Sequence, residues 1–102
     1  MAKGTSYLAI DLGAESGRIV HGWLEGGRLH LDEIHRFPNK PVLLPDAAGK
    51  TSLRWDILYL WREILEGIGR FVREMNVEIA SIGLDTWGVD FCLLDRRGEM
   101  LA

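Results

Sequence analysis

Residues 7–18 have the sequence YLAIDLGAESGR, in which an apolar run ends in Asp11 and a short turn containing two glycines follows. A short apolar run closed by Asp and Gly is typical of a strand that is buried on both faces of a sheet. The last residues of such a strand lie at a loop, where a ligand can reach them. This stretch therefore contains both the first strand of the fold and the first candidate site.

The next two segments predict a β-hairpin. Residues 18–25 and 28–37 have strand-like sequences on either side of Gly26-Gly27, and a two-residue hairpin turn requires the positive φ that glycine adopts freely. The apolar alternation of the second arm changes before Ile34, which predicts a bulge or the end of the strand near residues 32–33.

An amphipathic helix is predicted after a connecting loop. Residues 38–51 hold all three prolines, and within this loop only residues 42–44 are expected to pair, and briefly. Asp56 is the expected N-cap and Asn76 the expected C-terminal stop. The apolar positions recur at spacings of three and four and form one face: Ile57, Leu60, Trp61, Ile64, Leu65, Ile68, Phe71, Val72 and Met75.

A second strand of the buried type is predicted over residues 79–84, and it also ends in an aspartate, Asp85. Residues 91–95 and 99–102 flank a turn-like Arg-Arg-Gly and predict a last hairpin. This order is typical of the opening of a ribonuclease-H-like (actin-like ATPase) α/β domain, with three antiparallel strands, one crossover helix and a parallel strand. Ligands gather at the carboxyl ends of parallel strands, so Asp11 and Asp85 are expected at the same edge.

Composition excludes several classes of protein. A chain of 102 residues forms one domain at most. Twelve Lys and Arg against fifteen Asp and Glu give a net charge of -3, which argues against nucleic acid as a partner. The single cysteine, Cys92, excludes a disulfide framework and is expected in the core. No apolar run approaches the roughly 20 residues of a membrane span, so we expect a cytoplasmic protein with no membrane partner.

The first candidate site is the turn after Asp11. Its backbone N–H groups could approach a phosphate, the Ser16 hydroxyl could donate to it, and Arg18 could place a positive charge beside it. Asp11 could hold a hydrated Mg²⁺. An ordinary hairpin turn with a surface Asp and Arg is an equally weighted interpretation of the same residues.

The second candidate site is Asp85-Thr86-Trp87-Gly88-Val89-Asp90. The carboxylates could accept hydrogen bonds from sugar hydroxyls, Gly88 could let a substrate approach the backbone, and the Trp87 ring could cover an apolar sugar face. The alternative, at even weight, is a turn cap followed by a core tryptophan.

Taken together, residues 9–18 (AIDLGAESGR) and 81–100 (SIGLDTWGVDFCLLDRRGEM) resemble the amino-terminal part of the FGGY carbohydrate kinases. Residues 33–37 (EIHRF) and 53–56 (LRWD) are also similar to segments of these enzymes. The DTWGVDF element, together with Ala14 where the broader family usually has Thr, resembles the members that act on L-rhamnulose.

The resemblance implies an ATP phosphate loop, a magnesium residue and a sugar site. Asp11 would help organise Mg²⁺, Gly88 would contact the sugar, and Asp85 and Asp90 would be its neighbours. The phosphate loop would include five residues: Ala14, Glu15, Ser16, Gly17 and Arg18.

The implied reaction transfers the γ-phosphoryl group of ATP to the 1-hydroxyl of L-rhamnulose. Residues 1–102 would be the N-terminal portion of the first kinase domain. The second domain, the adenosine-binding segments and the aspartate general base are expected beyond the end of the chain, which would be inactive alone. Three alternatives remain: an FGGY kinase for another ketose or deoxy sugar, a metal-dependent nuclease built on Asp11 and Asp85, and a non-catalytic interaction module.

Overall fold

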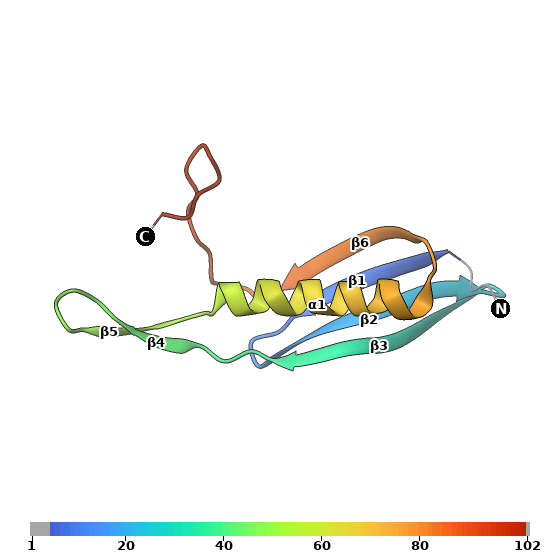
Figure 1. Ribbon diagram of the computed structural model, residues 1–102, viewed down its shortest axis with the longest axis horizontal. Helices are drawn as coiled ribbons and strands as arrows, with labels where there is room; N and C mark the ends of the chain where they lie inside the picture. Colours follow the sequence, from blue (N-terminus) through green and yellow to red (C-terminus); the bar gives the residue numbers. More distant parts are fainter. Residues whose placement is uncertain (1–4, 102) are drawn as a thin grey trace.

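The computed structural model describes residues 5–101, in which a four-stranded mixed sheet carries one helix along one face and two arms extend from this body (Figure 1). The sheet has the order β3-β2-β1-β6, with β1 antiparallel to β2 and parallel to β6. This confirms three antiparallel strands, a crossover helix and a parallel fourth strand. The elements are β1 (Ser6–Leu12), β2 (Ser16–Glu25), β3 (Arg28–Pro38), β4 (Val42–Pro45), β5 (Thr51–Arg54), α1 (Ile57–Met75) and β6 (Ile79–Thr86).

The hairpin of β2 and β3 contains the predicted bulge. Ile19 pairs with His35 and Val20 pairs with Glu33, so Ile34 is the extra residue on β3. The bulge thus lies one residue beyond the predicted position. At the other end of the hairpin, Gly26 and Gly27 have φ of 60° and 76°, as the predicted turn requires.

The helix α1 begins and ends where the sequence indicates. The Asp56 side chain accepts a hydrogen bond from the backbone N–H of Tyr59 at 3.1 Å, and Asn76 is left-handed at φ 47° and ψ 44°. Gly67 lets the helix approach the sheet closely, because a Cβ there would overlap Ile19 Cδ1 and lie 3.0 Å from His35 Cδ2.

The core lies between α1 and one face of the sheet. It consists of Leu8, Ile10, Leu12, Ile19, Phe37, Leu60, Ile64 and Phe71.

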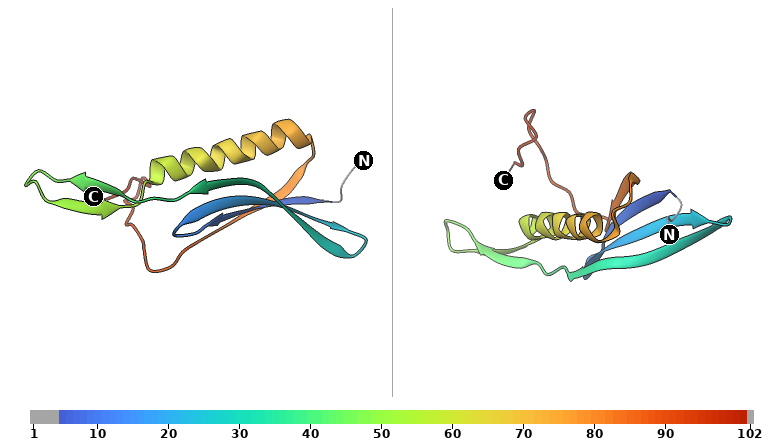
Figure 2. Two further views of the ribbon diagram at one scale, coloured as in Figure 1. Left: turned by 90° about the horizontal axis from the view of Figure 1, so that it is seen from below. Right: turned by 45° about the vertical axis from the view of Figure 1, so that its right-hand side comes forward.

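The prediction that β1 and β6 are buried on both faces was wrong. β1 alternates between buried and exposed residues, and in β6 the side chains of Ile82 and Leu84 are 47% and 62% exposed. The physical reason is coverage, because α1 packs mainly over β2 and β3 and lies along one side of the sheet (Figure 2). Similarly, the sheet covers only part of the predicted apolar face of the helix, so Ile57, Trp61, Leu65 and Val72 stay exposed.

The first arm is a hairpin of β4 and β5, where the sequence predicted a connecting loop. The brief pairing expected of residues 42–44 occurs, and its partners are residues 52–54.

The second arm contains residues 88–101. The strands predicted over 91–95 and 99–102 do not form among the described residues, where an isolated bridge joins Leu94 to Met100; Ala102 lies outside that part of the chain. Cys92 is exposed on this arm, so its expected place in the core was wrong.

The two arms end in the same kind of turn. In Asp46-Ala47-Ala48-Gly49-Lys50, one Asp46 carboxylate oxygen accepts from the N–H groups of Ala48 and Lys50, both at 2.9 Å. Asp95 accepts in the same way from Arg97 and Glu99, at 2.8 Å and 2.9 Å. Gly49 and Gly98 both have φ of 82°. An aspartate followed three residues later by glycine is therefore the local signal for both turns.

The arms make the molecule long, with extents of 59 × 30 × 26 Å and a radius of gyration of 17.1 Å. A compact domain of this length has a radius of gyration of about 13 Å. Within residues 5–101, no helix is both long and apolar enough to cross a membrane.

Candidate functional site

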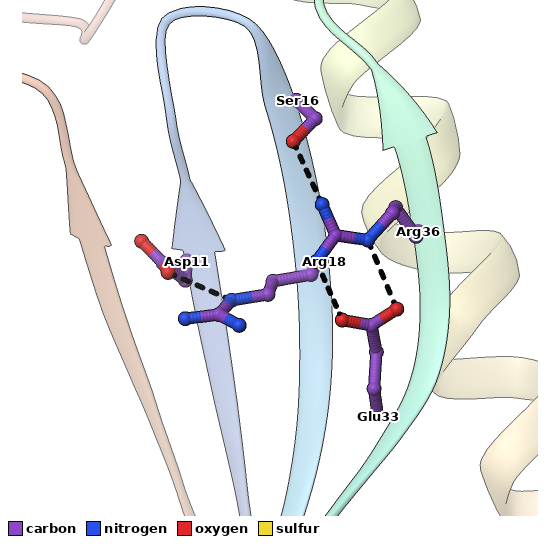
Figure 3. A network of polar contacts seen from close by, with 5 residues as sticks. All are labelled: Asp11, Ser16, Arg18, Glu33 and Arg36. Carbon is purple, nitrogen blue, oxygen red and sulfur yellow. Dashed lines mark hydrogen bonds and ion pairs between the residues drawn. The ribbon is translucent and has the colours of Figure 1, made fainter.

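Four charged residues form a row across the sheet. Asp85 on β6 is the register partner of Asp11 on β1, Asp11 is the partner of Arg18 on β2, and Arg18 is the partner of Arg36 on β3. Asp11 and Arg18 alternate with core residues, so their row lies on the face of the sheet away from α1. Two carboxylates therefore stand beside two guanidinium groups, and Figure 3 shows three of the four residues, Asp11, Arg18 and Arg36.

The two carboxylates share a hydrogen bond and differ in acidity. The hydrogen bond from Asp85 lowers the pKa of Asp11, and the hydrogen bond from Arg18, whose Nε lies 3.0 Å from Asp11 Oδ2, lowers it further. The same hydrogen bond to Asp11 raises the pKa of Asp85, and desolvation and the negative charge of Asp11 add to this increase. The pair therefore holds a proton at a pH where an isolated aspartate would lose it.

Arg36 is one of the site residues that sequence reasoning missed. Its Nη1 donates to Ser16 Oγ at 3.1 Å, while its Nε and Nη2 donate to the two carboxylate oxygens of Glu33 at 3.0 Å and 2.8 Å (Figure 3). In a regular strand, residues three apart point to opposite faces, but the extra residue Ile34 returns Glu33 and Arg36 to the same face. Arg36 also lowers the pKa of Glu33, mainly through this hydrogen bonding.

The turn between β1 and β2 is held by hydrogen bonds within the turn and by hydrogen bonds from Asn39. The N–H of Gly13 donates to the carbonyl of Ser16 at 2.9 Å, and a Cβ on Gly13 would lie only 2.8 Å from that oxygen. Asn39, which is 3% exposed, donates its side-chain amide to the Gly13 carbonyl and its backbone N–H to the Glu15 carbonyl, both at 2.9 Å. The sequence did not identify Asn39, whose role depends on where the chain leaves β3.

The five residues of the predicted phosphate loop have different surroundings. Ala14 and Glu15 are exposed at the tip of the turn, and Ser16 and Arg18 lie on the face of the charged row. Gly17 lies on the opposite face, where a Cβ would overlap the ring of Phe37. Packing against Phe37 is therefore sufficient to explain the glycine at this position.

The residues of the second candidate site divide into two groups. Asp85 belongs to the charged row, whereas Asp90 lies beyond the end of β6 and is bound by two tryptophans. Trp87 Nε1 and Trp55 Nε1 donate to the same oxygen, Asp90 Oδ2, at 2.8 Å and 3.0 Å. Gly88 lies between these groups, and a Cβ built on it would have no neighbour within 4 Å.

The position of Trp87 agrees in part with the alternative of a core tryptophan after a turn. Trp87 is half-buried against the core, and its backbone N–H donates to the Leu12 carbonyl at 3.1 Å. Its indole N–H meanwhile reaches Asp90. Trp55 was not predicted as a site residue, since its contact with Asp90 joins segments 35 residues apart.

A metal ion would find few protein ligands here. Among the described residues, no cluster of three or more His, Cys, Asp or Glu side chains is suited to bind a metal. Asp11 and Asp85 provide two carboxylates side by side, which fits an ion such as Mg²⁺ that takes one or two carboxylates and completes its shell with water and phosphate. Arg18 already places a positive charge against Asp11, so a metal ion at Asp11 would have to displace this ion pair.

Comparison with known proteins gives a consistent result. No family model matches the chain. The chain is 47% identical over 97 residues to the rhamnulokinase of Bacteroides thetaiotaomicron, 46% identical over 94 residues to that of Oceanobacillus iheyensis, and 42% identical over 95 residues to that of Bacillus subtilis. These alignments cover 92–94% of this chain and 18–19% of each relative, so the chain spans about a fifth of their length.

Proposed function

We propose that this chain forms the nucleotide- and sugar-binding first part of an ATP-dependent kinase for L-rhamnulose. It is 38–47% identical to seven rhamnulokinases over 91–94% of its length. The similarity to these enzymes is the observation that carries the proposal. The charged row at one end of β1, β2, β3 and β6 supports it, since it combines cation-binding and anion-binding groups.

Under this proposal, residues 1–102 are the opening of a ribonuclease-H-like first kinase domain. The sheet order β3-β2-β1-β6 and the crossover through α1 support this assignment. The general base and the adenosine-binding segments would come from the four-fifths of such a kinase that this chain does not span.

The phosphates of ATP would bind at the turn between β1 and β2. Backbone N–H groups of residues 14–17 would face the phosphate oxygens, while the Ser16 hydroxyl and Arg18 would donate to them. Arg36 would hold Ser16 in place and add a second positive charge. Glu15 would turn away from the phosphates, because a carboxylate beside a polyphosphate is unfavourable.

Asp11 would hold Mg²⁺, with Asp85 beside it. The ion would neutralise negative charge on the phosphates during transfer. Arg18 would leave Asp11 for a phosphate oxygen as the ion binds, so that each carboxylate and each guanidinium keeps an opposite charge.

The sugar would bind at the loop after β6. Gly88 would let it approach the backbone, and Asp85 and Asp90 would accept hydrogen bonds from its hydroxyls. Phosphoryl transfer of this kind depends mainly on positioning and charge stabilisation, which are the roles assigned here to residues of this chain.

A chimera tests the proposal. The aligned segment of the Bacillus subtilis rhamnulokinase is replaced by residues 5–101 of this chain, and ADP formation is measured with L-rhamnulose. We expect ADP formation that depends on L-rhamnulose in the chimera, and none above background with the isolated chain. A chimera that is folded, as shown by a cooperative thermal unfolding transition, but phosphorylates no sugar would contradict the kinase assignment. Turnover by the isolated chain would contradict its predicted inactivity.

A kinase for another ketose or deoxy sugar is the second candidate, since the charged row contains nothing specific to one sugar. A panel of such sugars in the same assay separates the two. Faster phosphorylation of another sugar at equal concentration would replace L-rhamnulose as the substrate and leave the phosphate and magnesium sites unchanged.

A further inference from the structure

The carboxylate of Asp90 is bound by two tryptophans from different parts of the chain. Trp55 directly precedes the N-cap of α1, and Trp87 directly follows β6. Their indole N–H groups donate to Asp90 Oδ2 at 3.0 Å and 2.8 Å, and the ring centroids are 4.4 Å apart at an interplanar angle of 51°. The loop after β6 is thereby tied to the start of the helix.

Both indoles use the same carboxylate oxygen. Among the described residues, no hydrogen bond reaches the other oxygen, Asp90 Oδ1, and Asp90 is exposed. Hydrogen bonds to an ionised carboxylate are stronger than those between neutral groups, so two of them on Oδ2 fix the orientation of the whole group. Oδ1 has no hydrogen-bond partner among the described residues and can therefore accept hydrogen bonds from a ligand.

The backbone beside Asp90 is held in an unusual conformation. Val89 has φ of 69°, in the left-handed region that a β-branched residue rarely adopts, and its side chain is 99% exposed. Packing of Val89 therefore does not account for this conformation, which lies next to the carboxylate that the two indoles bind. Strained residues of this kind are found where neighbouring groups must be held in place.

We propose that Trp55 is a positioning residue, which together with Trp87 orients Asp90 so that Oδ1 accepts hydrogen bonds from the hydroxyl groups of a sugar. This inference rests on the proposed function, and it adds a residue outside the two candidate motifs. Gly88 leaves room beside the carboxylate, and the two indole rings supply apolar surface for the C–H face of the sugar. The helix N-cap at Asp56 keeps Trp55 in place from the other side.

The test uses the four tryptophans of the chain as reporters. The complete 102-residue chain is labelled with ¹⁵N at the indoles, and their signals are followed during titration with L-rhamnulose and, separately, with MgADP. The variants are Asp90→Asn, Trp55→Phe and Trp61→Phe. Trp61 is the matched control, because it lies exposed on α1 and has no part in either site.

We expect Asp90→Asn to move the Trp55 and Trp87 indole signals together and to leave the Trp61 signal in place. L-Rhamnulose should shift the same two signals in the parent chain. Trp55→Phe should raise the half-saturating concentration of L-rhamnulose about tenfold, with the MgADP titration unchanged, and Trp61→Phe should change neither titration. A purely structural role for Trp55 would not separate the two ligands in this way.

Each other outcome contradicts a specific statement. If Asp90→Asn moves neither indole signal, the Trp55–Asp90–Trp87 contact is absent and the inference is wrong. If L-rhamnulose binds the parent and the Trp55→Phe variant equally, Trp55 has no positioning role, although the proposed function stands. A parent chain that does not bind L-rhamnulose contradicts this inference whether or not it binds MgADP, and the chimera assay decides the proposed function separately.

Discussion

At the scale of single residues, the Asp11–Asp85 pair links the stability of the fold to pH. The ordinary pKa of both carboxyls is 3.8, and the structure lowers that of Asp11 and raises that of Asp85. The stabilisation from ionised Asp11 is present above pH 3.8 and is lost as the pH falls through its lowered pKa. The opposite holds for Asp85, whose protonated form favours folding and whose contribution is lost as the pH rises through its raised pKa.

We therefore expect two separate titration steps, one for each carboxyl group, on either side of pH 3.8. Arg18→Gln should raise the pKa of Asp11, because a hydrogen bond and a positive charge are removed from its carboxylate. The measurement is the ¹³C chemical shift of the side-chain carboxyls as a function of pH. Superimposed steps in the parent chain would show that the two carboxyls do not interact.

Arg36 provides the second prediction at this scale. Arg36→Lys keeps the charge but cannot reproduce the forked contact with Glu33 or the simultaneous contact with Ser16. We expect the half-saturating concentration of MgADP to rise about tenfold, equivalent to about 1.4 kcal/mol and close to the low end for a hydrogen bond to a charged group. Calorimetric titration measures this change.

The control for Arg36 is Arg70→Lys. Arg70 lies on the exposed side of α1 and pairs with Glu74 at 3.1 Å, so it is an arginine with a carboxylate partner far from the turn. Nucleotide affinity should be unchanged by this substitution. Equal effects of the two substitutions would show that Arg36 contributes only through general charge and stability.

At the scale of elements, replacing each of the two glycines of α1 by alanine should change the free energy of unfolding in opposite directions. Gly67→Ala introduces a methyl group that overlaps Ile19, and overpacking of this kind costs about 1–3 kcal/mol in the free energy of unfolding. Gly69→Ala meets only the mobile end of Arg73, so the helix gains about 1 kcal/mol from the better helix former. Urea denaturation of both variants measures the two changes, and the same sign for both would contradict the close approach of α1 to β2.

The sequence predicted elements better than it predicted their surroundings. The spacing of apolar residues located α1, and the parity change before Ile34 located the bulge, because both signals are local. Burial of β6 was predicted wrongly, since an apolar run such as residues 79–84 records which side chains favour burial and contains no information on which element covers them. The β4–β5 hairpin was missed because prolines in residues 38–51 favoured a loop, although Asp46 and Gly49 carry the turn signal seen again at Asp95 and Gly98.

For the candidate site too, the sequence predicted what depends on local signals and missed what depends on contacts between distant segments. The meeting of Asp11 and Asp85 was predicted, because two parallel strands must end at the same edge. Arg36 and Trp55 were not, since one depends on the register of β3 after the bulge and the other on a contact across 35 residues. The roles of residues 14–18, 85, 88 and 90 toward ligands remain predictions.

At the scale of the whole molecule, the chain exposes more surface than a folded protein of its mass. Its solvent-accessible surface is 7919 Å², whereas a monomeric protein of 11.5 kDa has about 5,800 Å². Part of the excess is apolar and lies on the outer side of α1 and on β6. Large exposed apolar surfaces favour association with other proteins or with copies of the same chain.

We therefore expect the isolated chain to self-associate as its concentration rises, and to bind dyes that fluoresce on apolar surfaces. Replacing Leu84 and Leu65 by lysine should reduce both effects without unfolding the chain, because both side chains are more than half exposed. Sedimentation velocity and dye fluorescence provide the measurements. A parent chain that stays monomeric and causes no increase in dye fluorescence would show that the exposed apolar surface of α1 and β6 does not drive association. The same result would weaken the alternative of a non-catalytic interaction module.

The parallel pairing of β1 with β6 also determines when the charged row can be completed during synthesis. Asp11 pairs with Asp85, so 74 further residues must be added after Asp11 before its partner exists. At about 5–20 residues per second, the ribosome needs several seconds for this stretch, while the hairpin of β2 and β3 can already pair with β1. Throughout this interval the free edge of β1 has unpaired backbone groups, which are open to other strands. The edge on which the carboxylate pair depends is thus an unpaired sheet edge of the nascent chain, and chaperone protection of this edge should matter until residue 86 emerges.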